Sequence, residues 1–439
     1  MLRCDAVLDD TPGSVLRRLT PLKPCFGHRA EPVSLGAYVS GLLSDSPRKS
    51  TQAMLARVTA APAYHAVQHF ITNAPWSAAR MWRALRSELP EHRGLLLDDT
   101  GFAKKGTESV GVARQYSGTL GKIGNCQVAV TAALWTGVRA WLVAAAPYLP
   151  ESWASDSERC ARAHVPQTVR FRKKWEMALH LLQQVRASGI TITGVLSDSG
   201  YGDATSFRTA LHRLKLPHGL GISGTLTVFL DPPQLDLPGS VKRPRLRYPR
   251  ATLGATAPPV TVKAVADAWP AEAWDHVTWQ NGDPPARGAL CAAVRITPAH
   301  DWKQGRLLPE IWLLLEPPDD RPGVTKYYFV HLLRRTALAR LVQFVHQRWP
   351  IEQQCQQLKT ELGLDHFERR TYPGWHHHVV VSAVAYAFLQ HERMQRDTMI
   401  TFEAIHAIVQ EIFAGLLFAS CPRCARWLEE ARQLLPLRL

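Results

Sequence analysis

Four acidic residues in this sequence occupy positions from which carboxylates could do chemistry. Asp98 and Asp99 directly follow three leucines in LLLDDTG, Asp198 follows the apolar run in GVLSDSG, and Glu352 lies in RWPIEQQCQQLK. Because successive side chains of a strand point to opposite faces, only one of Asp98 and Asp99 can face a given site. The pair is therefore either a functional carboxylate with an oppositely directed neighbour or two solvated residues that open a polar turn.

These acids could form one site if the two apolar runs are neighbouring strands. Asp99 and Asp198 would then converge at the strand ends, and a helix would supply Glu352. Like charges ~4 Å apart repel by ~4 kcal/mol at moderate dielectric, and a divalent cation would relieve that repulsion. Carboxylate oxygens favour Mg²⁺, for which Mn²⁺ can substitute, over zinc. Two such ions, ~3.5–4 Å apart, would activate a water or a 3′-hydroxyl in phosphodiester chemistry.

The segments around the acids have the periodicity of helices and strands. Residues 1–90 include SLGAYVSGLLSD and SAARMWRALRSEL, which are apolar at helical spacing, and the second has a basic face. Three consecutive strands are expected from GLLLDD, NCQVAVTAALWT and RAWLVAAAPYLP, which would form an antiparallel meander that opens a mixed sheet. Helices are expected from FRKKWEMALHLLQQVRASG and ATSFRTALHRLKLP, on either side of the strand that ends at Asp198.

The remainder of the chain changes composition twice, first to a β-prone segment and then to helical segments. Residues 225–335 are rich in Pro and Gly, with β-prone pieces such as IWLLLE and KYYFVHL, which indicates a β-rich insertion. From Ala337 a long helical stretch passes through RWPIEQQCQQLKTELGL, and a second follows a Pro-Gly break. The last segment, TFEAIHAIVQEIFAGLLF, is amphipathic and is expected to pack on the body of the protein.

Composition favours a polyanionic partner. The 439 residues contain 52 Lys and Arg against 37 Asp and Glu, a net charge of +15 that favours nucleic acid, although a soluble basic protein is the alternative. Eight scattered cysteines do not form a disulfide framework, and the lone CPRC pair is a weak zinc signal. The N-terminus lacks a signal-peptide pattern, and no uninterrupted apolar run reaches the ~18 residues of a membrane span. We expect a cytoplasmic protein.

Several basic residues could hold nucleic-acid phosphate, each with a plainer alternative. Arg348, Glu352 and Lys359 are spaced to share one helix face, either as a site or as an ordinary ion pair on a solvated face. Lys104 and Lys105 could clamp a phosphate or be surface lysines. The strip KRPRLRYPR could track a backbone or be a solvated loop, and its candidates are Lys242, Arg243, Arg245 and Arg247.

Aromatic residues and histidines leave similar choices. The tryptophans of the insertion could stack on a displaced base or, more simply, pack in a core; they are Trp269, Trp274, Trp279 and Trp302. The run His376–His378 is similar in composition to a metal tract. Because consecutive residues of a helix point in different directions, we interpret it as local packing and phosphate contacts.

The three acidic segments together resemble the catalytic blocks of bacterial insertion-sequence DDE transposases. The last block of that family reads Tyr-x-x-Arg-x-x-x-Glu-x-x-x-x-x-x-Lys, and Arg348, Glu352 and Lys359 fit it. Val345 stands where the family has its tyrosine, so a hydroxyl that would contact DNA phosphate is missing. In DDTGFAKKG and LSDSGYGD, the resemblance places the first two catalytic acids on Asp99 and Asp198. It extends over residues 34–391.

The resemblance implies an α/β fold: an RNase H-like mixed sheet flanked by helices, interrupted by a β-rich insertion, with helical N- and C-terminal parts. The expected divisions are a DNA-binding or dimerisation region (1–90), the first part of the catalytic core (91–224), the insertion (225–335), the last part of the core (336–395) and a helical tail (396–439).

The same resemblance implies a chemistry and its partners. Two Mg²⁺ ions held by Asp99, Asp198 and Glu352 would support cleavage and strand transfer of double-stranded DNA by a homodimer, associated with the bacterial nucleoid and not with a membrane. The alternatives are a domesticated regulator that binds DNA without cutting it, and a related nuclease that does not join ends.

Overall fold

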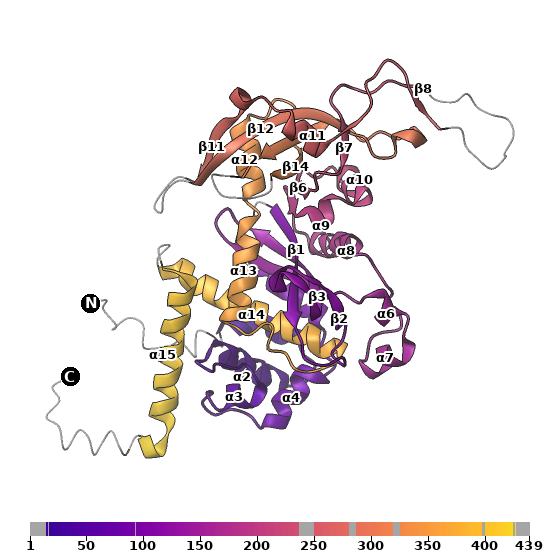
Figure 1. Ribbon diagram of the computed structural model, residues 1–439. Coiled ribbons are helices and arrows are strands. Elements are labelled where there is room, and N and C mark those ends of the chain that lie inside the picture. The colour runs from indigo at the N-terminus through magenta and orange to yellow at the C-terminus, as the bar shows by residue number, and fades with distance from the viewer. Residues whose placement is uncertain are drawn as a thin grey trace.

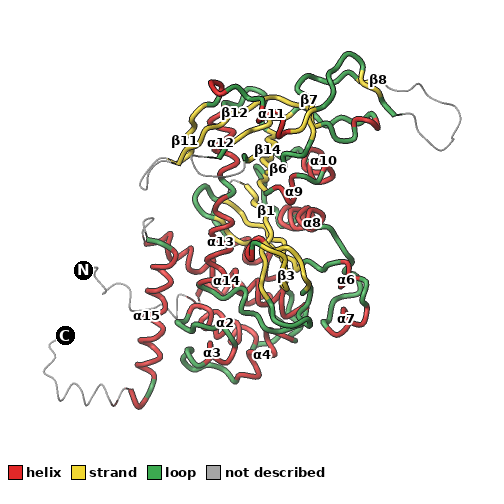
Figure 2. The backbone as a smooth tube through the Cα atoms, in the orientation of Figure 1, coloured by secondary structure: helices red, strands yellow, loops and turns green. Residues whose placement is uncertain are grey.

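The computed structural model describes residues 15, 17–92, 94–236, 250–280, 287–318, 325–396, 400–424 and 426. The chain begins with short helices, namely α2 (Glu31–Leu43), α3 (Thr51–Leu55), α4 (Tyr64–Thr72) and α5 (Ala78–Ser87). The sheet then starts with β1 (Gly94–Ala103), β2 (Ala113–Ser117), β3 (Lys122–Trp135) and β4 (Ala140–Pro147). Figures 1 and 2 show these helices packed below the sheet.

The middle of the chain alternates helices with strands. It contains α6 (Glu151–Ala154), α7 (Ser157–Arg162), α8 (Lys174–Arg186), β5 (Val195–Ser197), α9 (Ser199–Gly202), α10 (Thr205–Arg213) and β6 (His218–Ile222). The β-rich segment follows, with β7 (Thr227–Phe229), β8 (Leu235–Asp236), β9 (Thr252–Leu253), β10 (Val260–Thr261), α11 (Val262–Asp267), β11 (Asp275–Gln280), β12 (Arg287–Pro298), β13 (Ile311–Glu316) and β14 (Lys326–His331). Four helices end the described chain: α12 (Leu338–His346), α13 (Trp349–Thr360), α14 (Tyr372–Arg396) and α15 (Phe402–Ser420).

One large mixed sheet runs through the molecule. Its order is β10-β7-β12-β13-β14-β6-β5-β1-β3-β2, with β11 beside β12 and β4 beside β3. Strands β1, β5 and β6 are parallel neighbours, and β1 is antiparallel to β3. Strand β14 pairs with β6, so the β-rich segment continues the sheet, as Figure 1 shows near the top of the view. The predicted α/β class, a mixed sheet flanked by helices, is confirmed.

Each face of the sheet buries its own core. Leu95 and Leu97 lie on one face with residues of α8 and α10, such as Leu181 and Phe207. Leu96 lies on the other face with residues of α12, including Leu341 and Phe344. All three leucines of β1 are at most 1% exposed, which explains why this strand is apolar at consecutive positions. The sheet is thus a middle layer, with α8 on one side and α12 and α13 on the other.

Two expectations about local structure were wrong. Strand β1 does not end in a turn after Asp99, because Thr100–Ala103 continues to pair with β3 opposite Ala129–Cys126. The helical stretch from Ala337 is also not continuous. It divides into α12 and α13 at Arg348, next to Pro350, a residue that fits the first turn of a helix but not its interior.

The last described helix lies at the side of the body. In the described part of the chain, α15 is the one helix long and apolar enough to cross a membrane by length and composition, and 22% of that window is buried. A single helix of this kind does not indicate a membrane protein. Phe402, Ile405 and Val409 of α15 pack into the core that α14 also lines, so the predicted packing on the body is confirmed.

Candidate active site

The pairing of β1 with β5 brings the acidic residues to one edge. Leu96 lies opposite Leu196 and Leu97 opposite Ser197, so Asp98 and Asp198 come next on two neighbouring parallel strands. Alternation along β1 places Asp98 on the face of Leu96 and Asp99 on the face of Leu97. Helix α13, which carries Glu352, covers the Leu96 face, so the two aspartates of the pair meet different surroundings.

Asp98 is held by an arginine that also binds Glu352. Arg348 caps the start of α13, and its Nη1 donates to Asp98 Oδ2 at 2.9 Å. Its Nη2 forms a short ion pair with Glu352 Oε1 one turn along the helix. Burial raises the pKa of Asp98 to about 7; Arg348 opposes that shift and the nearby Asp198 carboxylate adds to it. The result is a linked cluster of Asp98, Arg348 and Glu352 on one face.

Asp99 pairs with a different cation. Its Oδ2 accepts from Nζ of Lys174, the first residue of α8, and the two side chains are 26% and 33% exposed. The Lys174 ammonium also lies 5.7 Å from the centre of the Tyr148 ring. Asp99 is thus neutralised on the face of the sheet that α8 covers.

Asp198 lies between these two arrangements. It immediately follows β5 and occupies the N-cap position of the short helix α9, without a capping hydrogen bond from its side chain. Burial raises its pKa, Arg348 and Lys174 act against that shift, and Asp99 acts with it. Its Oδ1 is buried and, within the described residues, has no hydrogen-bond partner. This oxygen is a buried acceptor of the cluster without a partner.

A close backbone contact positions the Asp198 turn. A Cβ added to Gly202 would lie 1.9 Å from the carbonyl oxygen of Gly221 in β6, far inside van der Waals contact. Only glycine at 202 lets α9 lie this close to β6. Gly202, the second glycine of GYGD, therefore has a packing reason: it holds the turn after Asp198 against β6.

The predicted lysines have structural contacts. Lys359 Nζ donates at 2.9 Å to both Gly101 O and Thr119 Oγ1, which ties α13 to β1. Lys104 Nζ donates to Asp365 O at 3.1 Å and Phe367 O at 2.7 Å, between α13 and α14. Lys105 is exposed. Lys359 shares its helix with Arg348 but points at the backbone of β1, so the structure brings it to the strand and not to the carboxylates.

Two further sequence candidates have clear positions. Val345, in place of the family tyrosine, is 5% exposed and packs in the core of the Leu96 face. Trp279 stacks on His346 with ring centres 3.6 Å apart and is partly buried against the same core, which is the packing alternative. The basic strip candidates lie outside the described residues: Lys242, Arg243, Arg245 and Arg247.

Sequence reasoning missed two features of this site. It did not assign Lys174 to the site, although the run Arg172-Lys173-Lys174 before a helix is a visible cationic signal. It also did not predict that Arg348 joins Asp98 to Glu352; the contact of Arg348 with DNA phosphate stays a prediction. No local pattern reports a contact between residues 250 positions apart, so only the register of β1, β5 and α13 could have revealed it.

The donors suit a hard divalent cation, although they are not gathered around one point. Within the described part of the chain, no group of three or more His, Cys, Asp or Glu side chains is arranged to hold a metal ion. Arg348 instead stands between Asp98 and Glu352. The available donors are carboxylate oxygens, one of them the unpartnered Asp198 Oδ1, which is the ligand chemistry that Mg²⁺ and Mn²⁺ prefer.

Comparison with known proteins agrees with these features. The sequence profile of a family described as "DDE superfamily endonuclease" matches residues 21–285, more than half of the chain, and includes Asp98, Asp99 and Asp198. A curated relative from Microchaete diplosiphon, "Probable transposase for insertion sequence element IS701", is 32% identical over 201 residues, which are 44% of this chain and 50% of the relative. The chain thus spans about half the length of that relative. The resemblance drawn from the three acidic segments is confirmed.

Proposed function

Because this chain belongs to the DDE superfamily of endonucleases, we propose that it is a DNA transposase. It would bind the terminal inverted repeats of an insertion sequence and catalyse metal-dependent cleavage and strand transfer. The observation that carries this proposal is the placement of Asp98 and Asp198 on neighbouring parallel strands, beside the helix that supplies Glu352. The similarity to a probable insertion-sequence transposase supports it.

The proposed metal ligands are Asp198, Glu352 and one aspartate of the 98–99 pair. The register of β1 favours Asp98, since it faces Arg348 and Glu352 whereas Asp99 faces Lys174. Asp99 stays the competing prediction from the sequence. Two Mg²⁺ ions bound there, for which Mn²⁺ can substitute, would activate the attacking water or 3′-hydroxyl and stabilise the leaving oxygen.

Two cationic side chains balance the negative charge of the acidic residues. Arg348 and Lys174 neutralise Asp98, Glu352 and Asp99, so the acids tolerate their close approach. Both cations are partly exposed, and guanidinium and ammonium groups can bind the phosphate of a DNA strand. Lys359 ties α13 to β1 through the Gly101 carbonyl, and Lys104 ties the end of β1 to the segment between α13 and α14 through the Phe367 carbonyl. Their direct contact with DNA, and that of Lys105, remains a prediction.

The proposed partner is double-stranded DNA, both the element ends and the target, bound by a homodimer because synapsis joins two ends. A basic chain of +15 suits that partner and a place at the nucleoid. One observation favours the alternative of a regulator that binds DNA without cutting it: Arg348 bridges Asp98 and Glu352 where a cation would bind. The alternative predicts binding of the ends without cleavage.

Cleavage of a supercoiled plasmid that carries the element's own ends tests the proposal. We expect wild-type protein to excise and join the ends in Mg²⁺, and Glu352→Gln to bind them without cutting. The matched control is Glu158→Gln on α7, because Glu158 also pairs with an arginine at the i,i+4 position, Arg162. Binding without cutting by the wild type, in Mg²⁺ and in Mn²⁺, would exclude the transposase and leave the regulator. Cutting without joining would indicate a nuclease.

A further inference from the structure

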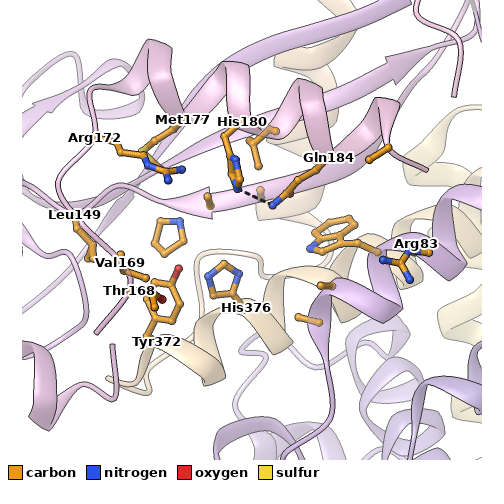
Figure 3. A pocket seen from close by; sticks show the side chains of 18 of the residues that line it. Arg83, Leu149, Thr168, Val169, Arg172, Met177, His180, Gln184, Tyr372 and His376 are labelled. Atoms are coloured by element: carbon orange, nitrogen blue, oxygen red, sulfur yellow. Dashed lines mark hydrogen bonds between the residues drawn. The ribbon is translucent and has the colours of Figure 1, made fainter. Parts of the chain in front are cut away.

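A cavity of about 610 Å³ lies beside the sheet, away from the acidic residues. Helix α8 forms one wall and the beginning of α14 the opposite wall, with α5 and the segment before α8 at the ends. Figure 3 shows His180 and Gln184 of α8 facing His376 and Tyr372 of α14 across the space. The volume is within the range of ligand sites, ~300–1,000 Å³, and far exceeds the space that one phosphate group needs.

The lining of this cavity is cationic. Four arginines contribute to it and no Asp or Glu does; the arginines are Arg83, Arg86, Arg170 and Arg172. Arg86 is committed to the fold, because its Nε donates to Val143 O at 3.0 Å and its Nη1 to Ser188 Oγ at 2.6 Å. Arg83 and Arg172 are exposed, and among the described residues neither is ion-paired with a carboxylate.

The pKa values of Arg86 and His180 are both lowered, in part by arginines at the two ends of the cavity. Burial and then Arg83 lower the pKa of Arg86 to about 10. Burial and then Arg172 lower the pKa of His180. Arg83 and Arg172 lie at opposite ends of the labelled side chains in Figure 3, so the cavity presents separated cations to one extended anion rather than a single cluster.

Helix α8 joins the cavity to the candidate active site, because its first turn reaches Asp99 and its middle lines the cavity. Lys174, at the start of this helix, binds Asp99, and Arg172 lines the cavity two residues earlier. Along α8 the lining residues run from Met177 to Gln184, which is roughly 10 Å at 1.5 Å per residue. That length corresponds to about three base pairs of a duplex at 3.4 Å each.

We propose that this cavity binds the phosphodiester backbone of duplex DNA next to the strand held at the acidic residues. The inference rests on the proposed function and adds to it a second contact, on the α8 face of the sheet. Arg83 and Arg172 would each bind a backbone phosphate, while the ring faces of Tyr372 and His376 would lie against the sugars. A free phosphate or a mononucleotide would engage one end only.

The test is binding of a random-sequence duplex over a series of salt concentrations. We expect Arg83→Glu/Arg172→Glu to weaken binding about 10-fold or more at low salt and to reduce the slope of log K against log[salt] by about 2, at close to 0.9 for each lost phosphate contact. Arg186→Glu is the matched control, since Arg186 is an exposed arginine on the same helix and does not line the cavity. Thermal melting of each variant excludes loss of folding.

The same preparations separate the two proposals. Plasmid cleavage by the wild type, with affinity and salt slope of the double variant equal to those of Arg186→Glu, would overturn the cavity proposal and leave the transposase standing. A reduced slope in the double variant without cleavage by the wild type would support the cavity and remove the transposase. Charge-neutral variants at the same two positions should give the same slope change with a smaller loss of affinity, and an unchanged slope would count against the cavity.

Discussion

The neighbouring aspartates Asp98 and Asp99 lie on opposite faces of strand β1 and have different ion-pair partners. On one face Asp98 is 14% exposed and bound by Arg348, which also holds Glu352. On the other face Asp99 is 26% exposed and bound by Lys174 at the start of α8. The residues are chemically identical and adjacent in sequence. Because side chains alternate along the strand, Asp98 faces α13, which carries the further carboxylate Glu352. Asp99 instead faces α8, the helix that also lines the basic cavity.

The cation on each face is supported to a different degree. Arg348 follows His346, whose ring stacks on Trp279 and whose Nε2 lies 2.9 Å from Glu316 Oε2. Glu316 also accepts from Lys326 Nζ at 2.8 Å and is buried at the end of β13. Lys174 instead follows a loop of exposed basic residues. The cation on the Asp98 face is therefore supported by the β-rich segment, whereas the cation on the Asp99 face follows an exposed loop.

Exchanging each aspartate for its amide tests the comparison most strongly. We expect Asp98→Asn to lower plasmid cleavage by at least about 10²-fold, because a neutral amide cannot replace an anionic ligand for a divalent cation. Asp99→Asn should retain most of the activity, since Asp99 faces Lys174. The measurement is cleavage rate at saturating Mg²⁺. The opposite ranking would establish Asp99, as the sequence predicts, and refute the assignment from register.

Thermal melting gives the same comparison without catalysis. A cation at ten times its dissociation constant stabilises the folded protein by about 1.4 kcal/mol. We expect Mg²⁺ to raise the melting temperature of the wild type and of Asp99→Asn, and to leave that of Asp98→Asn unchanged. A chelator should reverse the shift.

The sequence predicted the acidic segments and the class of fold, but not the geometry that selects between the aspartates. Asp198 and Glu352 follow from a strand-to-turn pattern and a helical motif, and the mixed sheet follows from alternating periodicities. Asp98 could not be distinguished from Asp99, because β1 continues through the expected turn to Ala103 and is set by pairing with β3. That pairing depends on residues about 30 positions away.

The other predictions also succeeded where the structure depends on one local segment and failed where it depends on residues distant in the sequence. The packing interpretation of the histidine run is confirmed for His377, which bonds to Ile71 O and Trp76 O, and for His378, which bonds to Leu364 O. Helical geometry was sufficient for that prediction. The extension of the core sheet by β14 and the bridge made by Arg348 required long-range pairing, which no single segment encodes.

The apolar residues below the two aspartates should contribute equally to stability. Leu96 and Leu97 are 1% and 0% exposed, on opposite faces. We expect Leu96→Ala and Leu97→Ala each to lower the free energy of unfolding by about 2–5 kcal/mol, measured by urea denaturation. At equal folded fraction, Leu96→Ala should lower cleavage more, because it loosens the contact with α12 and hence Arg348. A larger loss of cleavage in Leu97→Ala would contradict the difference between the faces.

Removing the support of Arg348 should have a smaller effect. Glu316→Gln exchanges a buried carboxylate that accepts from Lys326 and His346, whose hydrogen bonds outweigh the burial that opposes ionisation and lower its pKa. We expect a loss of about 1–3 kcal/mol in unfolding free energy and a lower cleavage rate with DNA affinity retained. The control is Glu310→Gln, because Glu310 forms an ion pair with Arg295 in the same segment. Equal cleavage by both variants would show that the β-rich segment does not position Arg348.

The smallest expected effect comes from Lys174, the cation on the Asp99 face. Lys174 and Asp99 are both about one-quarter to one-third exposed, so Lys174→Met should change the unfolding free energy by less than about 1 kcal/mol. The informative measurement on Lys174→Met is its affinity for Mg²⁺. If Asp99 were a ligand, removal of its competing ammonium would tighten Mg²⁺ binding, whereas a site built on Asp98 would keep nearly the same Mg²⁺ affinity. Calorimetric titration of Mg²⁺ into wild type and Lys174→Met decides this, and Lys173→Met serves as the control because Lys173 is the adjacent exposed lysine.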